Sequence, residues 1–368
     1  MASKPGRLKW IDYARGIAII LVVYRHAFEG LKESGLDVFS HMYLEYANIF
    51  FFSFRMPLFF IVSGVFIVMS LRKRGLGKFV ATKGKTILYP YFLWACIQLT
   101  IQLFFSAYTN GSPTAQTYLY LFYLPREIAH FWYLYALFNI SVLYAFTVDV
   151  LKFRWPHNMV LGAILFALSI YTWQNDIVTG FVGDILHYYI FFAIGDAVSG
   201  FILDRDKSQL LGATKMILVL LIPFLAGQAY FLLANMDHAE AKYMYVEYYQ
   251  PVAFLLIALT GCAFVISISF LLQRTNRLNW LSILGRHSLY IYVAHVIFFA
   301  ATRIFLRNFF DIHNVPVLLF CGIIAGLIFP VLLFKISQKI GMWWLFSLEK
   351  ETPSRRPVKL AATSSGQI

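Results

Sequence analysis

The stretch VPVLLFCGIIAGLIFPVLLF, from Val315 to Phe334, contains twenty consecutive residues and no charged side chain. A helix of that length extends about 30 Å, which is the thickness of the hydrocarbon core of a bilayer. The stretch therefore predicts a transmembrane helix, which we extend to residues 315–340.

Similar apolar runs recur along the 368 residues, separated by charged or Gly- and Pro-rich breaks. Hydrophobic residues make up 60% of the chain and charged residues 13%, about half the charged fraction of soluble domains. This composition excludes a soluble globule. We predict an all-α integral membrane protein of about ten transmembrane helices. Its membrane domain covers residues 1–345, and residues 346–368 form a disordered cytoplasmic tail. The expected spans are residues 11–28, 47–71, 86–108, 128–151, 158–173, 185–203, 213–234, 251–273, 287–304 and 315–340.

The net charge of +13 is distributed unevenly between the two sides that these spans define. One side receives both termini and 23 of the 31 Lys and Arg residues, whereas the loops of the other side contain five of them and eleven acidic residues. Lys and Arg concentrate in the cytoplasmic loops of membrane proteins. The asymmetry predicts cytoplasmic termini, and it explains the basic composition without a nucleic-acid partner.

Ionisable residues inside spans cost about 2.5–3.5 kcal/mol each on insertion scales, so each needs a partner or a purpose. Arg15 and His26 are eleven residues apart. They therefore project from one helix face, offset by about 20° and about 16 Å apart along the axis. Asp12 can neutralise Arg15 from one turn away. The structural alternatives are an Arg15–Asp12 ion pair and a His26 that hydrogen-bonds between helices. The shared face, with Arg55 available on the second span, favours a functional role.

The segment WIDYARGIAIILVVYRH, from Trp10 to His26, resembles the opening of the membrane-bound acyltransferase 3 family, which typically has an I-D-x-x-R-G-I-A motif and an R-x10-H pair. The resemblance covers about residues 8–340. Many relatives have His in F-H-M-P where this chain has Arg55, and the family's R-x-x-R element is replaced by Lys83 and Lys85. The other stretches that resemble family motifs are FRMPLFFIVSG (Phe54–Gly64), LYPYFLW (Leu88–Trp94), HFWYL (His130–Leu134) and LGRHSLYIYVAH (Leu284–His295).

The resemblance implies transfer of an acyl group, usually acetyl, from cytoplasmic acyl-CoA to a hydroxyl of a cell-surface or lipid-linked carbohydrate, in the inner membrane of a bacterium. The Arg and His of the R-x10-H pair are essential in the family, and they match Arg15 and His26. Succinyl-CoA is an alternative donor. The alternative from another class is a polytopic transporter or flippase, in which intramembrane Arg and His are equally normal. The sequence shows no inverted repeat, which speaks against that class.

O-acylation requires a base for the acceptor hydroxyl and a cation or dipole near the thioester oxyanion. We expect His26 to act as the base or as a nucleophile that carries the acyl group, and both options stay open. Arg55 can stabilise the oxyanion or bind an acidic sugar, and its structural alternative is an ion pair with Glu29 or Glu45. Acyl-CoA is expected as a substrate, with no bound cofactor and no metal. The oligomeric state is not readable from the sequence.

Arg15 is expected to hold part of acyl-CoA, with Asp12 orienting its guanidinium group. Lys83 and Lys85 are candidates for binding the CoA phosphates, although basic residues are equally typical of an ordinary cytoplasmic loop over residues 72–85.

Further candidates for substrate binding lie on the fourth and ninth spans. Trp132, beside His130, can act as a platform for a sugar ring or as an interfacial anchor. Ser288, Tyr292 and His295 form a polar stripe at helical spacing, and interhelical hydrogen bonding is its structural alternative.

Overall fold

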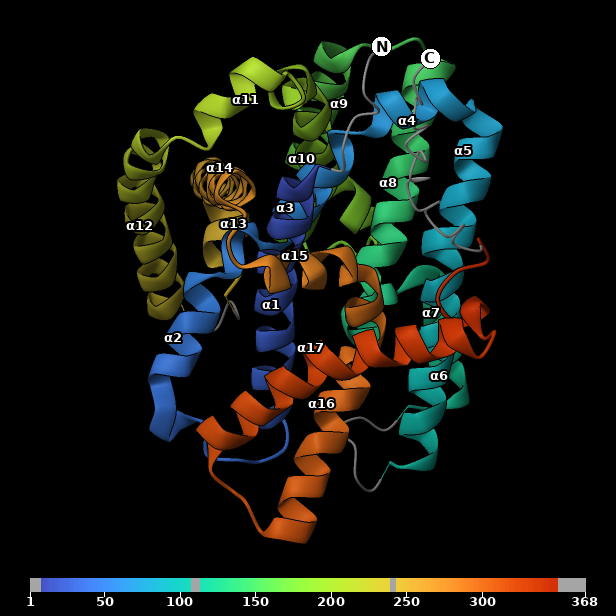
Figure 1. Ribbon diagram of the computed structural model, residues 1–368, viewed down its shortest axis with the longest axis vertical. Coiled ribbons are helices and arrows are strands. Elements are labelled where there is room, and N and C mark those ends of the chain that lie inside the picture. The colour runs from blue at the N-terminus through green and yellow to red at the C-terminus, as the bar shows by residue number, and fades with distance from the viewer. Residues whose placement is uncertain (1–7, 107–112, 239–242, 350–368) are drawn as a thin grey trace, which may run out of the picture.

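The computed structural model describes residues 8–106, 113–238 and 243–349, and within these ranges all regular secondary structure is helical (Figure 1). The prediction of an all-α protein is confirmed. Eight helical stretches of the described chain are long and apolar enough to cross a membrane, and they coincide with eight of the expected spans. They are Phe39–Arg74, Leu76–Phe104, Pro125–Asp149, Phe181–Ile202, Thr214–Asp237, Pro251–Thr275, Ser288–Phe310 and Val315–Lys339.

The first and fifth expected spans are also helices, although they lie outside this set of eight. In α1 (Lys9–Lys32), the apolar sequence is interrupted by Asp12, Arg15 and Arg25. In α9 (Trp155–Gln174), the first turn is polar. The total of ten crossings and the cytoplasmic location of the termini stay predictions.

Helix α1 lies at the centre of the bundle. A helix enclosed by protein can carry charged residues, because these face neighbouring helices and cavities rather than lipid. The helices that contact it most are α3 (Phe52–Gly64), α14 (Pro251–Thr275), α15 (Asn279–Arg286), α16 (Ser288–Phe310) and α17 (Val315–Lys339).

Helices α1 and α15 cross with their backbones in contact at two glycines. A Cβ atom at Gly16 would lie 2.2 Å from the carbonyl oxygen of Leu281, and one at Gly285 would lie 1.6 Å from the carbonyl oxygen of Asp12. No residue other than glycine fits at these positions without a shift of the backbone. This crossing fixes the part of α1 that carries Asp12 and Arg15.

The second expected span, residues 47–71, is not one continuous helix. It is divided into α2 (Met42–Phe50), α3 and α4 (Ile67–Arg74), with one interruption at Phe51 and another between α3 and α4. Pro57 inside α3 removes a further backbone hydrogen bond. The interruptions bring side chains of α2 and α3 next to the end of α1.

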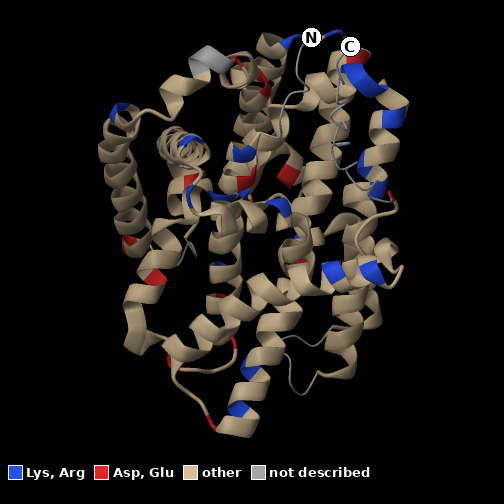
Figure 2. Cartoon of the chain, viewed as in Figure 1, with Lys and Arg blue, Asp and Glu red and all other residues tan. Residues whose placement is uncertain are grey.

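The prediction of a basic loop over residues 72–85 is wrong, because this segment is mostly helical. Helix α5 (Leu76–Lys83) follows α4 after a single residue, Gly75, whose φ of +73° ends the preceding helix. A π-helical turn, η2 (Gly84–Leu88), then leads into α6 (Tyr89–Phe104). Figure 2 shows the basic positions along α4 and α5. Each basic side chain therefore has a fixed direction.

The remaining helices complete the wall around α1. Helix α10 packs against α3, α8 and α9, and α12 packs against α14. Of the expected tail, residues 350–368 lie outside the described residues, whereas Phe346 is buried against Trp94. The other segments are η1 (Phe39–His41), η3 (Ala115–Leu119), α7 (Tyr120–Tyr123), η4 (Pro125–Phe131), α8 (Trp132–Asp149), α10 (Phe181–Ile202), α11 (Arg205–Leu211), α12 (Thr214–Asp237), α13 (Tyr245–Tyr249) and η6 (Trp343–Leu345).

Candidate active site

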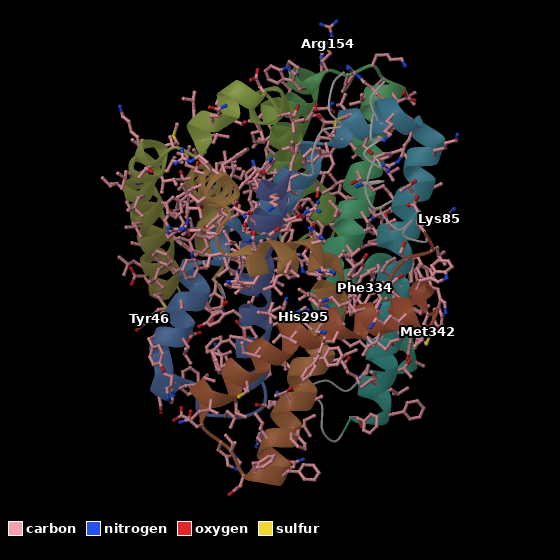
Figure 3. The ribbon with its side chains drawn as sticks, in the orientation of Figure 1. Tyr46, Lys85, Arg154, His295, Phe334 and Met342 are labelled. Carbon is pink, nitrogen blue, oxygen red and sulfur yellow. The ribbon has the colours of Figure 1, made fainter. Side chains whose placement is uncertain are left out.

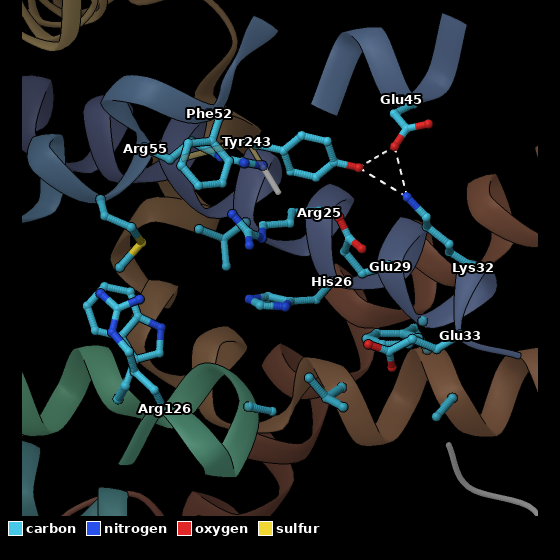
Figure 4. A pocket seen from close by; sticks show the side chains of 18 of the residues that line it. Arg25, His26, Glu29, Lys32, Glu33, Glu45, Phe52, Arg55, Arg126 and Tyr243 are labelled. Atoms are coloured by element: carbon cyan, nitrogen blue, oxygen red, sulfur yellow. Dashed lines mark hydrogen bonds and ion pairs between the residues drawn. The ribbon is translucent and has the colours of Figure 1, made fainter. Parts of the chain in front are cut away.

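A cavity of about 1530 Å³ lies beside the last turns of α1 (Figure 4). Helices α1, α2, α3, α6 and α16 contribute to its wall, together with the junction between η4 and α8. Charged groups and aromatic rings alternate on this wall, which suits a polar ligand with apolar faces, such as a sugar. The lining residues include Arg25, His26, Glu29, Arg55, Trp132 and Tyr188.

Three histidines from distant parts of the chain meet beside this cavity. The ring centroid of His26 lies 5.5 Å from that of His130 and 5.3 Å from that of His295, and the last two are 4.7 Å apart. His26 lines the cavity, whereas His130 and His295 are almost completely buried. Within the described ranges no group of His, Cys, Asp or Glu has an arrangement that could hold a metal ion. Imidazole rings are the side chains that most often transfer protons near neutral pH, so the cluster is suited to proton transfer.

His295 is held in one tautomer by its own helix. Its Nδ1 atom lies 3.1 Å from the carbonyl oxygen of Ile291 and 2.8 Å from that of Tyr292. A ring nitrogen next to two carbonyl oxygens carries the proton, and this assigns the lone pair to Nε2. That Nε2 is buried and finds no hydrogen-bond partner in the described part of the chain. His295 therefore offers a proton acceptor close to His26.

The position of His130 depends on a local backbone distortion. The preceding residue, Ala129, has a φ of +53° inside η4. This conformation is rare for a residue with a side chain and persists only where the surroundings enforce it. The hydroxyl group of Tyr292 donates a hydrogen bond to the carbonyl oxygen of His130 and so ties η4 to α16.

Arg55 extends from α3 into the wall of the cavity, as the sequence predicts. The Nη1 atom of its guanidinium group donates to the carbonyl oxygen of Leu21 (3.2 Å) and to Oδ1 of Asn48 (3.1 Å). The expected alternative, an ion pair with Glu29 or Glu45, is not formed. Nδ2 of Asn48 donates to Glu29, so this amide lies between the two charged groups.

Arg25 lines the same cavity, with its guanidinium group 4.5 Å from the centre of the Phe52 ring. The guanidinium group of Arg55 lies 5.1 Å from the centre of this ring. Sequence reasoning assigned no site role to Arg25, nor to Asn48 and its bridge to Glu29. For Asn48, the signal available in the sequence was an amide side chain inside an apolar run.

Trp132 lines the cavity, but one of its neighbours restricts its use as a platform for a sugar ring. The guanidinium carbon of Arg126 lies 4.3 Å from the centre of the indole ring, and Nε of Arg126 forms a 2.7 Å ion pair with Asp184. The ring of Tyr188 lies 5.3 Å from that of Trp132. Together they give the cavity an aromatic wall.

Arg15 is not among the residues that line the cavity. It is half-buried, lies within electrostatic range of Lys83 and Tyr133, and shares α1 with the buried carboxylate of Asp12. The ring of Tyr133 in turn lies 5.2 Å from that of Tyr292. These two tyrosines therefore connect the surroundings of Arg15 with the histidine cluster.

Lys85 and Ser288 are not brought to the cavity. Lys85 is exposed at the periphery of the bundle, whereas His295 lies in its interior (Figure 3). Ser288 is buried at the start of α16, and of the expected polar stripe only Tyr292 and His295 reach the site. Lys83, half-buried beside Arg15, differs in this respect from Lys85.

A cluster of three polar residues, which we call the rim of the cavity, contributes to its lining, and dashed lines in Figure 4 mark its contacts. The ammonium group of Lys32 lies 2.9 Å from Oε1 of Glu45, and the hydroxyl group of Tyr243 donates to the same carboxylate. Burial, reinforced by this hydrogen bond, raises the pKa of Tyr243 to about 12. The phenol therefore stays protonated, and remains a donor, at any physiological pH.

The acyltransferase 3 family model, described as an acyltransferase domain, matches residues 8–335. The chain belongs to this family, so it is a membrane acyltransferase, and the family suggests a carbohydrate-type acceptor. The match covers all of the candidate site residues, and it favours an enzyme over the transporter or flippase. Neither a curated protein nor a solved structure matches the chain.

Proposed function

We propose that the protein transfers an acetyl group from acyl-CoA to a hydroxyl group of a cell-surface or lipid-linked glycan. The observation that carries this proposal is the position of His26, which lines a cavity of about 1530 Å³ in front of two buried histidines in a member of an acyltransferase family. The charge asymmetry of the loops supports a location in the bacterial inner membrane, with both termini in the cytoplasm.

In the proposed reaction His26 removes the proton from the acceptor hydroxyl as its oxygen attacks the thioester carbonyl carbon. The new C–O bond forms, the C–S bond breaks, and the CoA thiolate takes the proton back from His26. The lone pair on Nε2 of His295 can accept a hydrogen bond from the neighbouring imidazole, and so orient and stabilise that ring once it has taken up the proton. Transient acylation of His26 itself is the alternative route for the same overall transfer.

The donor binds at the opposite end of α1 in this proposal. Arg15 and Lys83 provide two positive charges within electrostatic range of each other, as expected for a site that binds the anionic parts of CoA. Asp12, in the same part of α1, limits the excess charge when no donor is present. Tyr133 and Tyr292 then border the route along which the thioester reaches His26.

The direct test uses purified protein in nanodiscs and acetyl-CoA labelled in the acetyl group. We expect transfer to a glycan extract from the host membrane, together with slow hydrolysis when the acceptor is left out. His26→Ala should abolish both, whereas His313→Ala should leave them unchanged, because His313 is exposed and lies outside the cavity.

Full activity of His26→Ala would exclude His26 as base or acyl carrier. Labelled succinyl-CoA, tested in parallel, identifies the donor. A rate with succinyl-CoA above the rate with acetyl-CoA would replace acetyl by succinyl in the proposal.

A further inference from the structure

Two cations in the cavity have no anionic partner, although other charged groups on the same wall are paired. Lys32 is bound to Glu45, and Arg126 is bound to Asp184. In contrast, neither Arg25 nor Arg55 forms an ion pair with any carboxylate of the described residues.

The guanidinium group of Arg55 is also incompletely hydrogen-bonded. Arg55 is 2% exposed, and the Nη2 atom of its guanidinium group is buried without a hydrogen-bond partner in the described chain. A buried donor without a partner costs about 1–3 kcal/mol, and more when the group is charged. Since Arg55 lines the cavity, a ligand in the cavity can supply the missing acceptor.

The two guanidinium groups share one aromatic ring and one nearby carboxylate. Both lie against Phe52, and each acts electrostatically on the other. Glu29 is within electrostatic range of both, but its hydrogen bond comes from Asn48. Glu247 also acts electrostatically on Arg25, but its Oε1 lies 3.0 Å from Nε2 of His187, so neither guanidinium group has a carboxylate of its own among the described residues.

We propose that Arg25 and Arg55 form an anion-binding subsite, and that it binds a carboxylate or phosphate group carried by the acceptor glycan. The subsite shares the cavity with His26, which places the anionic group near the hydroxyl that reacts. We assign the anion to the acceptor rather than to the donor because Arg15 and Lys83, the proposed donor site, do not line this cavity. This inference rests on the proposed function and restricts its substrates to acidic glycans.

The test measures binding without any acyl transfer, so that it can fail independently of the proposed reaction. The probes are methyl glucoside, methyl glucuronoside and methyl glucoside 6-phosphate, which differ in one substituent. Dissociation constants are measured by calorimetry on wild-type protein, Arg25→Gln, Arg55→Gln and the control Arg307→Gln. Arg307 lies on α16 outside the cavity and has the same charge as the two subsite residues.

We expect at least one acidic probe to bind about tenfold or more tightly than the neutral glucoside in wild type and in Arg307→Gln. Arg25→Gln and Arg55→Gln should abolish this preference. Arg25→Gln is informative even if Arg55→Gln does not fold, because the side chain of Arg25 donates no hydrogen bond to the backbone of the described residues. Equal binding of all three probes to wild type, or an acidic preference that survives both variants, would overturn the subsite.

The same variants distinguish acceptor from donor. If Arg25→Gln weakens succinyl-CoA but not the acidic glycosides, the anion belongs to the donor and the assignment to the acceptor is wrong. Conversely, a preserved acidic preference in His26→Ala supports the subsite even if the transfer assay contradicts the proposed reaction.

Discussion

The imidazole rings of His130 and His295 lie 4.7 Å apart, although the two residues come from different halves of the chain. Both are buried behind His26, which alone of the three lines the cavity. A substrate in the cavity can therefore touch His26, while the other two act through it. We treat His130 and His295 as positioning residues.

Replacement of His295 should slow the reaction more than it weakens substrate binding. Without the free lone pair at Nε2, the protonated His26 formed in the proposed reaction loses a neighbouring acceptor and is less well oriented, and misorientation of a reacting group costs about tenfold to a hundredfold in rate. We expect His295→Ala to lower kcat by this factor at nearly unchanged KM for the acceptor, and to change the pH dependence of kcat. His295→Gln should recover part of the rate, since its amide oxygen can accept a hydrogen bond.

His287→Ala is the matched control, because Nδ1 of His287 also lies close to the carbonyl oxygen four residues earlier (2.8 Å), but this half-buried residue lies outside the cavity. It should keep the wild-type kcat. A loss of thermal stability in His295→Ala with an unchanged pH profile would indicate a structural role only.

The sequence predicts only part of the candidate site. The depth of a residue within a span can be estimated from the sequence, but the side chains that pack next to it cannot. Arg15 and His26 are found from their spacing on one helix, since that geometry is local. His130 and His295 are expected as substrate-binding residues, yet their contact with His26 depends on the packing of α16 and η4 against α1 and on the distorted backbone at Ala129. No periodic pattern encodes such contacts.

For the fold, too, the sequence predicts the local features and misses those that depend on tertiary packing. Apolar runs locate the helices, because the requirement for about twenty apolar residues is imposed by the bilayer. They do not locate the break at Phe51, because the residues directly before and after it are apolar. Charge counting misplaced the basic segment 72–85 in a loop, since Lys and Arg are also good helix formers.

Lys83 and Lys85 should differ in their effect on the donor, although sequence reasoning treats them alike. Lys83 is half-buried within electrostatic range of Arg15, and Lys85 is exposed. Loss of a charged hydrogen bond of about 1.5 kcal/mol corresponds to roughly tenfold in affinity. We expect Lys83→Gln to raise KM for acetyl-CoA by about this factor and Lys85→Gln to leave it within about twofold. Equal effects would show that both lysines act only through the general charge of this region.

Gly285→Ala should destabilise the protein, because its Cβ would lie 1.6 Å from the carbonyl oxygen of Asp12. Forcing α1 and α15 apart should cost about 1–3 kcal/mol or more, as for other overpacked interiors. Gly77→Ala is the control and should slightly stabilise the protein. Gly77 lies in α5 with no heavy atom within 4 Å of the added Cβ, and alanine favours helix. Thermal unfolding midpoints in one detergent compare the two, and equal midpoints would contradict the close crossing.

Tyr243→Phe should weaken the rim of the cavity without affecting the histidine cluster. The variant removes the hydrogen bond from the phenol to Glu45 and leaves the Lys32–Glu45 pair in place, so a loss of about 1 kcal/mol in the free energy of unfolding is expected. The folded pKa of about 12 lies above the usual value of 10.0, so folding favours the protonated phenol. Its contribution is therefore complete below pH 10.0 and is lost as the pH rises through about 12.

The difference in unfolding midpoint between wild type and Tyr243→Phe should accordingly be constant from pH 7 to about pH 9. Tyr46→Phe, at an exposed position of α2, should show no difference at any of these pH values. A difference for Tyr243→Phe that already falls between pH 7 and about pH 9 would contradict the raised pKa, because it requires the folded phenol to ionise below its ordinary pKa.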